Sequence, residues 1–171
     1  MKKYIKIVLV TALLLSGANV FAQNYKFGHI NSNELFALMP ERDSAQQILQ
    51  NFAKELENQL ETMRVELNNK YNDYLNEQEN LTDLIKQTKE QEINDLDQRI
   101  RGFETTAQQE LQKKEAELFQ PIYEKANNAI QEVAKENKFT YVFDLAARAL
   151  IYFSEDSENI MPLVKKKLGI E

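Results

Sequence analysis

Apolar side chains recur at steps of three and four residues from Glu41 to Asn137, and this is the longest pattern in the chain. These 97 residues include one glycine, Gly102, and one proline, Pro121. Side chains at such steps lie on one face of an α-helix, so the pattern predicts a long amphipathic helical segment. A single straight helix of this length would reach about 145 Å. We therefore expect it to fold back as a two-helix hairpin.

Two apolar stripes divide this helical segment. The first contains Ala45, Ile48, Phe52, Leu56, Leu60, Met63, Leu67, Tyr71, Tyr74 and Leu81, and the second contains Leu96, Ile100, Phe103, Ala107, Leu111, Leu118, Ile122, Ala126, Ala129 and Val133. Their period of about 3.6 to 3.7 residues predicts nearly straight helices, unlike a leucine zipper. Between the stripes, Asn80, Thr82 and Asp83 favour helix termini. We therefore expect the turn near residues 80–84, and Gly102 is a weaker alternative.

Short apolar segments flank the hairpin on both sides. Tyr25–Ile30, Phe139–Phe143 and Leu150–Phe153 are rich in β-branched and aromatic residues. Such segments favour strands, so the sequence predicts three of them. Two short amphipathic helices are expected as well, at residues 34–39 and 162–168.

The order of these segments predicts an α+β protein with a long helical arm. Residues 23–40 and 138–171 form a β-rich head, and residues 41–137 form the arm. Gly169 stands where the C-cap of the last helix is expected. Because Pro40 cannot continue a helix from the preceding segment, it marks the boundary between head and arm.

The predicted head is too small to be stable alone. Three short strands in about 60 residues bury little apolar surface and leave the edges of the sheet unpaired. We therefore expect several subunits to join their strands in a central sheet or barrel from which the hairpins project. The residues expected at this subunit core are Phe27, Ile30, Tyr141, Phe143, Ile151 and Phe153.

Residues 1–22 have the pattern of a bacterial signal peptide. Lys2, Lys3 and Lys6 precede the apolar core Ile7–Leu15, and Val20-Phe21-Ala22 fits the site that signal peptidase cleaves. We expect cleavage after Ala22 and a periplasmic mature protein, because the apolar core is short for a membrane anchor. The chain has no cysteine, which excludes disulfides and thiolate metal sites.

The excess negative charge of the mature chain lies in the helical segment. Residues 41–137 carry 21 acidic and 12 basic side chains, so the arm should repel nucleic acid and anionic lipid at long range. We expect no catalytic, cofactor or metal site, because His29 is the only histidine and lies in an apolar strand. Asp144 and Arg148 are expected to cap the loop after the second strand.

Several segments occur in a characteristic order along the mature chain. They are Lys26–Asn31, Glu34-Leu35-Phe36, the long helical segment, Gln120–Lys125, Ala129–Glu136 and Tyr141–Asp144. Together they resemble the Skp/OmpH family of periplasmic chaperones. The resemblance implies a jellyfish-like homotrimer, in which a β-rich core carries three antiparallel coiled-coil arms around a cavity. It also implies that the cavity holds unfolded outer-membrane proteins and keeps them from aggregating. The sequence contains no glycine-rich phosphate-binding loop that would bind ATP.

The acidic arm departs from the basic arms of the best-known family members. Lys86, Lys89, Arg99 and Arg101 are the only cations near the tip, so a contact with lipopolysaccharide or membrane is not carried over. We expect client contacts to be diffuse along residues 41–137. The alternative is a structural envelope coiled coil, a spacer or stalk without clients, which would favour sustained heptads and an anchor.

Overall fold

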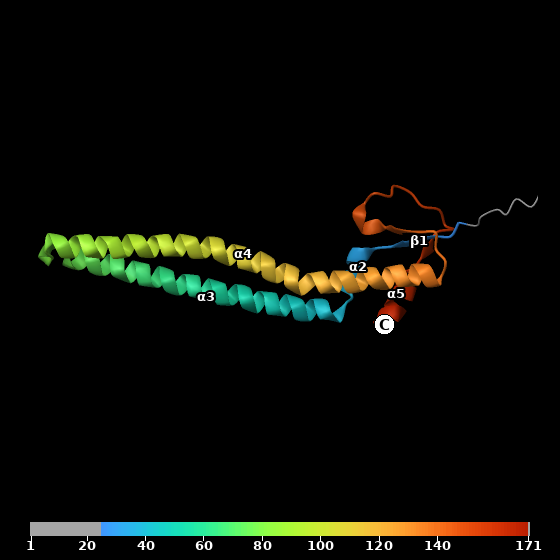
Figure 1. Ribbon diagram of the computed structural model, residues 1–171, viewed down its shortest axis with the longest axis horizontal. Coiled ribbons are helices and arrows are strands. Elements are labelled where there is room, and N and C mark those ends of the chain that lie inside the picture. Colours follow the sequence, from blue (N-terminus) through green and yellow to red (C-terminus); the bar gives the residue numbers. More distant parts are fainter. Residues whose placement is uncertain (1–24, 171) are drawn as a thin grey trace, which may run out of the picture.

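The computed structural model describes residues 25–170 and consists of a small head and a long helical hairpin (Figure 1). The predicted signal peptide lies outside the described residues. The elements in chain order are β1 (Phe27–Ile30), α2 (Ser32–Ala37), α3 (Pro40–Glu77), α4 (Asp83–Glu136), β2 (Tyr141–Asp144), β3 (Glu158–Asn159) and α5 (Met161–Leu168). Helices α3 and α4 lie side by side as the arm, and the last turns of α4 continue into the head.

The arm begins at Pro40, the first residue of α3. Proline suits this position because the first N–H groups of a helix have no partner within it and the proline φ angle is already helical. Helix α3 ends at Glu77, a 3₁₀ turn occupies Gln78–Asn80, and α4 begins at Asp83. Gly102 lies inside α4, so the chain does not turn at the weaker of the two predicted positions.

The two arm helices pack along the predicted stripes, with one difference of phase. Every residue of the second stripe is buried or half-buried. In the first stripe, however, Ile48 and Tyr71 are exposed, and their neighbours Leu49 and Lys70 are half-buried instead. Where two adjacent residues such as Ile48 and Leu49 are both apolar, spacing alone does not decide which of them faces the other helix.

Strand β1 is the centre of a three-stranded parallel sheet with the order β2-β1-β3. Phe27 lies opposite Tyr141, and Gly28 lies between Val142 and Glu158. Parallel neighbours require a long crossover connection, and here α2 and the whole hairpin connect β1 to β2. The arm is therefore an insertion between two adjacent strands, and its base is held by the sheet.

The predicted strand at Leu150–Phe153 is wrong. This segment has no strand structure, and the third strand is the polar pair Glu158–Asn159. A strand exists only where its main chain finds a partner, and the residues that reach β1 are those just before α5. Ile160 continues this contact by donating its N–H to the carbonyl of His29 at 3.0 Å. β-Propensity reports the fit of side chains to a half-buried pleated surface, so it does not identify which segment pairs.

The core of the protomer lies between the sheet, α2, α5 and the base of the hairpin. Its buried members are Ile30, Leu35, Met39, Ala45, Ile122, Ala126, Ala129, Val133, Ile160, Met161 and Val164. Gly28 allows close packing here, because a Cβ atom on it would lie 3.0 Å from both Ile160 Cγ2 and the Phe139 ring. Gly169 ends α5 with φ 70°, which confirms the predicted left-handed cap.

Contacts around the turn between α2 and α3 join the arm to the head. The rings of Phe36 and Tyr123 stack with their centroids 4.1 Å apart, and Lys125 forms an ion pair with Glu41. Pro121 lies inside α4 and removes one main-chain hydrogen bond from it. The stack and the ion pair therefore fasten α4 to its neighbours within four residues of Pro121.

Candidate assembly and binding surfaces

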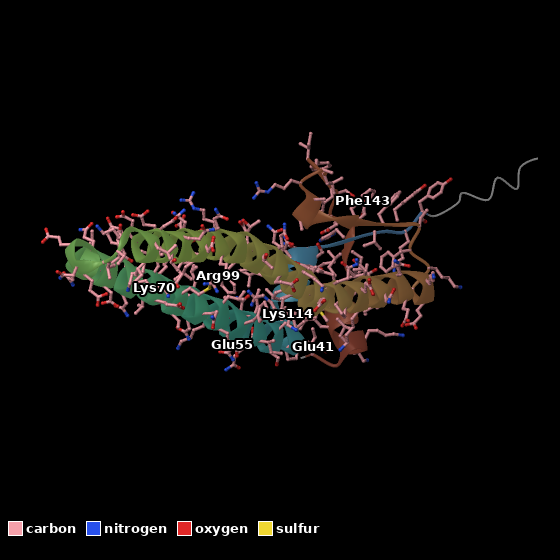
Figure 2. All side chains as sticks on the ribbon, turned by 60° about the vertical axis from the view of Figure 1, so that its left-hand side comes forward. Glu41, Glu55, Lys70, Arg99, Lys114 and Phe143 are labelled. Carbon is pink, nitrogen blue, oxygen red and sulfur yellow. The ribbon has the colours of Figure 1, made fainter. Side chains whose placement is uncertain are left out.

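The outer face of the sheet, away from α4 and α5, carries three aromatic rings. Side chains alternate between the two faces of a strand, so Phe27, Tyr141 and Phe143 point to the same side. Each pair of their ring centroids is 6.3 Å apart, and Figure 2 shows Phe143 on the side of the head away from α5. All three side chains are exposed. We call this patch the aromatic face, and contiguous apolar patches of this kind mark interaction sites.

Ile30 does not belong to the aromatic face, although the sequence places it with these residues. Its side chain is 2% exposed and lies in the protomer core with Leu35, Ile160 and Val164. It stands three positions after Phe27 in the same strand, so it points to the opposite face of the sheet. The contacts of Ile30 within one chain explain why it is apolar, and no second subunit is required.

The segment Leu150–Phe153 lies beside the aromatic face and contains the two most exposed large apolar side chains of the described residues. Ile151 is 102% exposed and Tyr152 is 79% exposed. Phe153 instead turns toward the sheet, where its ring centroid lies 4.4 Å from that of His29. A shallow hollow between this segment and the sheet is lined by Phe27, Phe143, Leu150, Tyr152, Phe153, Ser154 and Ser157.

His29 is half-buried in β1, the apolar strand in which the sequence places it, and its side chain has structural contacts. Its Nδ1 atom lies 2.9 Å from Ser157 Oγ, and its ring packs against Phe153. These contacts fasten the end of the loop after β2 to the central strand. Among residues 25–170, no group of three histidine or acidic side chains has the arrangement of a metal site.

The carboxylate of Asp144 joins the second strand to α2, which confirms its prediction as a capping residue. It accepts hydrogen bonds from Ser32 Oγ at 2.6 Å, from the Ser32 N–H at 3.0 Å and from the Ala146 N–H at 3.0 Å. Burial alone would raise the pKa of Asp144, but these three hydrogen bonds outweigh it and lower the pKa. Arg148 ends the 3₁₀ turn at Leu145–Ala147 in a left-handed conformation, with φ 50°.

Charged side chains cover the outside of the hairpin (Figure 2), and ion pairs cross between its helices. Arg64 lies 2.6 Å from Glu104, and Lys89 lies 3.2 Å from Glu77. The side chains of these pairs are substantially exposed. Solvent screens such pairs, so each contributes little to stability, and the outer surface of the arm is chiefly a source of solubility.

The seam between the arm helices becomes polar toward the tip. No apolar side chain is fully buried between residues 46 and 95 of the described chain, and the half-buried seam positions near the tip include Lys70, Tyr74 and Lys89. Lys70 lies 2.9 Å from Glu92. The hydrogen bond between these two side chains raises the pKa of Lys70 and lowers the pKa of Glu92. Tyr74 donates a hydrogen bond from its hydroxyl to Glu90. Charged and polar contacts therefore hold the two helices together in this part of the arm.

Exposed apolar side chains are distributed along the arm away from the seam. They include Ile48, Val65, Tyr71, Leu75, Leu84 and Ile85. Of these, Val65, Leu75, Leu84 and Ile85 were not predicted, because the stripe pattern selects residues that repeat at helical spacing and passes over isolated ones. Leu84 is 75% exposed and is the second residue of α4, beside the turn. The arm therefore offers several separate apolar contacts and no enclosed apolar pocket.

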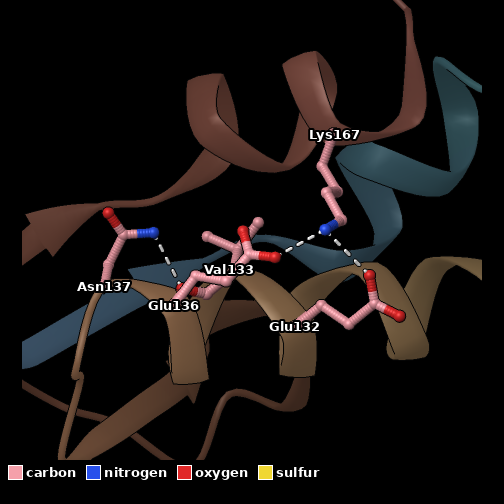
Figure 3. Close-up of polar contacts among 5 residues, drawn as sticks. All are labelled: Glu132, Val133, Glu136, Asn137 and Lys167. Carbon is pink, nitrogen blue, oxygen red and sulfur yellow. Dashed lines mark hydrogen bonds and ion pairs between the residues drawn. The ribbon is translucent and has the colours of Figure 1, made fainter.

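The opposite side of the head is closed by contacts between α5 and α4 (Figure 3). Lys167 Nζ lies 2.7 Å from Glu136 Oε1 and 3.0 Å from Glu132 Oε2. The hydrogen bonds to Glu136 and then Glu132 raise the pKa of Lys167. Asn137 Nδ2 donates to the Val133 carbonyl at 2.8 Å and finishes α4. These contacts cover this side of the head within one chain, whereas the three rings of the aromatic face are exposed among the residues that the structure describes.

Comparisons with known proteins agree over most of the chain. A family model described as "Outer membrane protein (OmpH-like)" matches residues 26–168. A solved structure from Caulobacter crescentus CB15, described as a candidate outer membrane chaperone (OmpH-like), is similar with a TM-score of 0.71 and 14% sequence identity, over 84% of this chain and 83% of that chain. At this identity the likeness concerns the fold. No curated protein matches the chain. Within residues 25–170, the helices lack the apolar length that crossing a membrane requires.

Proposed function

The chain belongs to the OmpH-like family of outer membrane proteins, and on this basis we propose that it is a periplasmic holdase chaperone. It binds unfolded outer-membrane proteins between helical arms and prevents them from aggregating. Such clients expose alternating apolar side chains and unpaired strand edges, which associate with one another at micromolar concentration. Enclosing one client chain keeps it from meeting another.

A homotrimer provides the enclosure that this function needs, because a single hairpin has no interior. The aromatic face is the observation that carries the proposal. Phe27, Tyr141 and Phe143 are exposed and adjacent in the protomer, on a head whose other side is closed by α5. Joining three aromatic faces buries these rings at the centre of the assembly and leaves three arms projecting from it.

The arms hold a client through many weak contacts. Exposed apolar side chains such as Ile48, Tyr71 and Leu84 provide apolar contact at different heights, and the acidic surface keeps the loaded complex soluble. Each contact is individually reversible, so simultaneous binding holds the client and stepwise dissociation releases it without ATP. We include no lipopolysaccharide or membrane contact, because the arm carries an excess of acidic side chains.

Localisation in the periplasm follows from the signal peptide predicted at residues 1–22. Cleavage after Ala22 leaves a mature chain that begins two residues before the first residue that the structure describes, Tyr25. An ATP-independent mechanism suits a compartment without ATP. We propose no catalytic activity, since the half-buried His29 has only structural partners, Ser157 and Phe153.

Native mass spectrometry of the mature protein tests this proposal, first alone and then with an unfolded outer-membrane barrel protein diluted from urea. The expected species are three chains alone and three chains with one client. A matched variant, Phe143→Asp, places a charge on the aromatic face and should give monomers that bind no client. A wild-type chain that stays monomeric at micromolar concentration, or a trimer that never binds the client, contradicts the proposal.

A further inference from the structure

We propose that His29 makes the assembly of the head sensitive to pH, so that the subunits separate when this histidine takes up a proton. The inference rests on the proposed homotrimer and adds a means of regulating it. Because the chain has a single histidine, a trimer contains three copies of it, one from each subunit.

His29 lies on the same side of the sheet as the aromatic face. It stands two positions after Phe27 in β1, so the two side chains point to the same side. It is also in register with Phe143 of β2, whose ring belongs to the aromatic face. Phe153 packs against the imidazole, with 4.4 Å between the ring centroids. A titratable ring therefore shares the surface that assembly would bury.

The imidazole has no charged partner among residues 25–170. The segments around it carry the charged side chains Lys26, Asp144, Arg148, Glu155, Asp156 and Glu158. Within the part of the chain that the structure describes, no hydrogen bond or ion pair joins any of them to His29. Lys26 instead pairs with Glu158 at 2.8 Å, and the carboxylate of Asp144 accepts hydrogen bonds from Ser32. A proton on His29 would therefore place an unpaired positive charge on this side of the sheet.

The contact between His29 and Ser157 tolerates either form of the ring. Nδ1 of the histidine lies 2.9 Å from Ser157 Oγ, and a hydroxyl group can donate to an unprotonated ring nitrogen or accept from a protonated one. The half-buried ring is also partly open to water in a single chain. Protonation should therefore leave the fold of the protomer intact and act on the contacts between subunits.

Assembly opposes protonation of the ring that it buries. Removing an imidazole from water disfavours its charged form, and three positive charges gathered at the centre of a trimer repel one another. Aspartate and glutamate ordinarily titrate well below about pH 5.5, and lysine and arginine well above about pH 7.5, so histidine is the side chain whose charge changes between these values. Subunit association is therefore strongest above the ordinary histidine pKa of about 6.5 and weakens as the pH falls through it.

The size of the effect follows from the number of histidines. If assembly excludes the proton completely, each His29 lowers the association constant about tenfold between about pH 7.5 and pH 5.5, and three lower it about a thousandfold. For a trimer, the chain concentration at the midpoint of assembly varies with the inverse square root of this constant, so it rises about thirtyfold. Separated subunits no longer enclose a client, and mild acid would release a held outer-membrane protein without ATP.

Sedimentation velocity of the mature protein at about pH 7.5 and pH 5.5 tests the inference. At a chain concentration a few times above the midpoint of assembly at the higher pH, we expect trimers that dissociate at the lower pH, while the circular dichroism spectrum stays unchanged. His29→Phe keeps an aromatic ring beside Phe153 but cannot be protonated, and His29→Asn keeps a hydrogen-bonding group near Ser157. Both variants should associate equally at the two pH values. The control Asp156→Asn changes an exposed charge in the neighbouring loop and should behave as the wild type does.

The outcomes separate this inference from the proposed assembly. A wild-type trimer whose midpoint concentration is the same at both pH values would overturn the inference and leave the trimer intact. The same holds if His29→Phe and His29→Asn dissociate in acid as the wild type does, or if both are monomeric already at the higher pH, which would assign His29 a packing role in place of a charge switch. A wild-type chain that is monomeric at every pH would overturn the proposed assembly as well.

Discussion

Lys70 and Glu92 form an ion pair across the hairpin, with 2.9 Å between Nζ and Oε2, at the level where the apolar seam ends. Toward the head, the next buried apolar side chain of α4 is Leu96. Toward the tip, ion pairs and polar contacts replace apolar packing. Because an exposed ion pair contributes little to stability, the distal part of the arm is held less firmly than its base, and it should open locally more often.

Replacing Lys70 with leucine should extend the apolar seam toward the tip. The half-buried position would then add apolar contact with α4 and stabilise the distal hairpin by about 1 kcal/mol, while Glu92 stays solvated. Hydrogen exchange of the amides in residues 70–92 should slow about fivefold. Lys54→Leu, at an exposed position off the seam, is the matched control and should change exchange little. Equal effects of both substitutions would show that the polar seam does not limit the stability of the tip.

The head should lose stability in acid through Asp144. Its pKa is lowered in the folded chain by hydrogen bonds from Ser32 and Ala146, against the effect of burial. A carboxyl group with a lowered folded pKa contributes stability above its unfolded pKa, and this contribution is lost as the pH falls below about 3.8 and through the folded value.

Asp144→Asn should therefore remove this contribution at neutral pH. The partly exposed carboxylate supports an estimate of about 1 kcal/mol. Urea unfolding followed by circular dichroism at pH 7 and pH 3 measures it, with the exposed Asp156→Asn as control. The variant should differ from the wild type at pH 7 and approach it at pH 3. A constant difference at both pH values would mean that the charge of Asp144 is not involved.

Leu35→Ala should destabilise the head strongly. Leu35 is 0% exposed and lies in the core cluster with Ile30 and Val164. Truncating a buried leucine costs about 2 to 5 kcal/mol, which thermal unfolding would report as a lower melting temperature. Leu84→Ala makes the same chemical change at a position that is 75% exposed, and it should shift the melting temperature by a small fraction of that amount. Similar shifts for the two variants would contradict the assignment of the core.

The mature protein should begin at Gln23. The tripeptide Val20-Phe21-Ala22 after a short apolar core is the basis for this prediction. Intact mass measurement of protein recovered from the periplasmic fraction would determine the first residue directly. Changing Ala22 to arginine should block processing, because the cleavage site requires a small residue there. A membrane-bound chain that retains residues 1–22 would identify the segment as an anchor.

The helical arm could be predicted from sequence because its signal repeats over many turns. An apolar period close to 3.6 residues leaves few alternatives to an α-helix. The interruption of the pattern at Asn80–Asp83 coincides with the break between α3 and α4. At Ile48 and Leu49 two adjacent residues are both apolar, and spacing placed Ile48 on the seam, whereas Leu49 occupies it. Spacing also placed Tyr71 on the seam, and there the neighbouring Lys70 occupies it.

The head was harder to predict because its strands are short and their partners lie far away in sequence. The composition of Leu150–Phe153 favours a strand, yet the two polar residues Glu158 and Asn159 pair with β1. The same limit applies to Ile30. The sequence shows that Ile30 is apolar, but it does not show which face of β1 packs against the core. In the structure Ile30 points into the core, whereas Phe27 points to the aromatic face.

Aggregation of an outer-membrane barrel protein, followed by light scattering after dilution from urea, tests the proposed holdase activity most directly. We expect equimolar trimer to suppress aggregation without nucleotide, and to do so almost equally at ~0.5 M salt, where the Debye length is about 4 Å, because apolar contacts hold the client. A variant in which a short turn replaces Tyr71–Leu96 should keep the trimer and lose the suppression. Aggregation that proceeds equally fast with and without the intact protein would contradict the account.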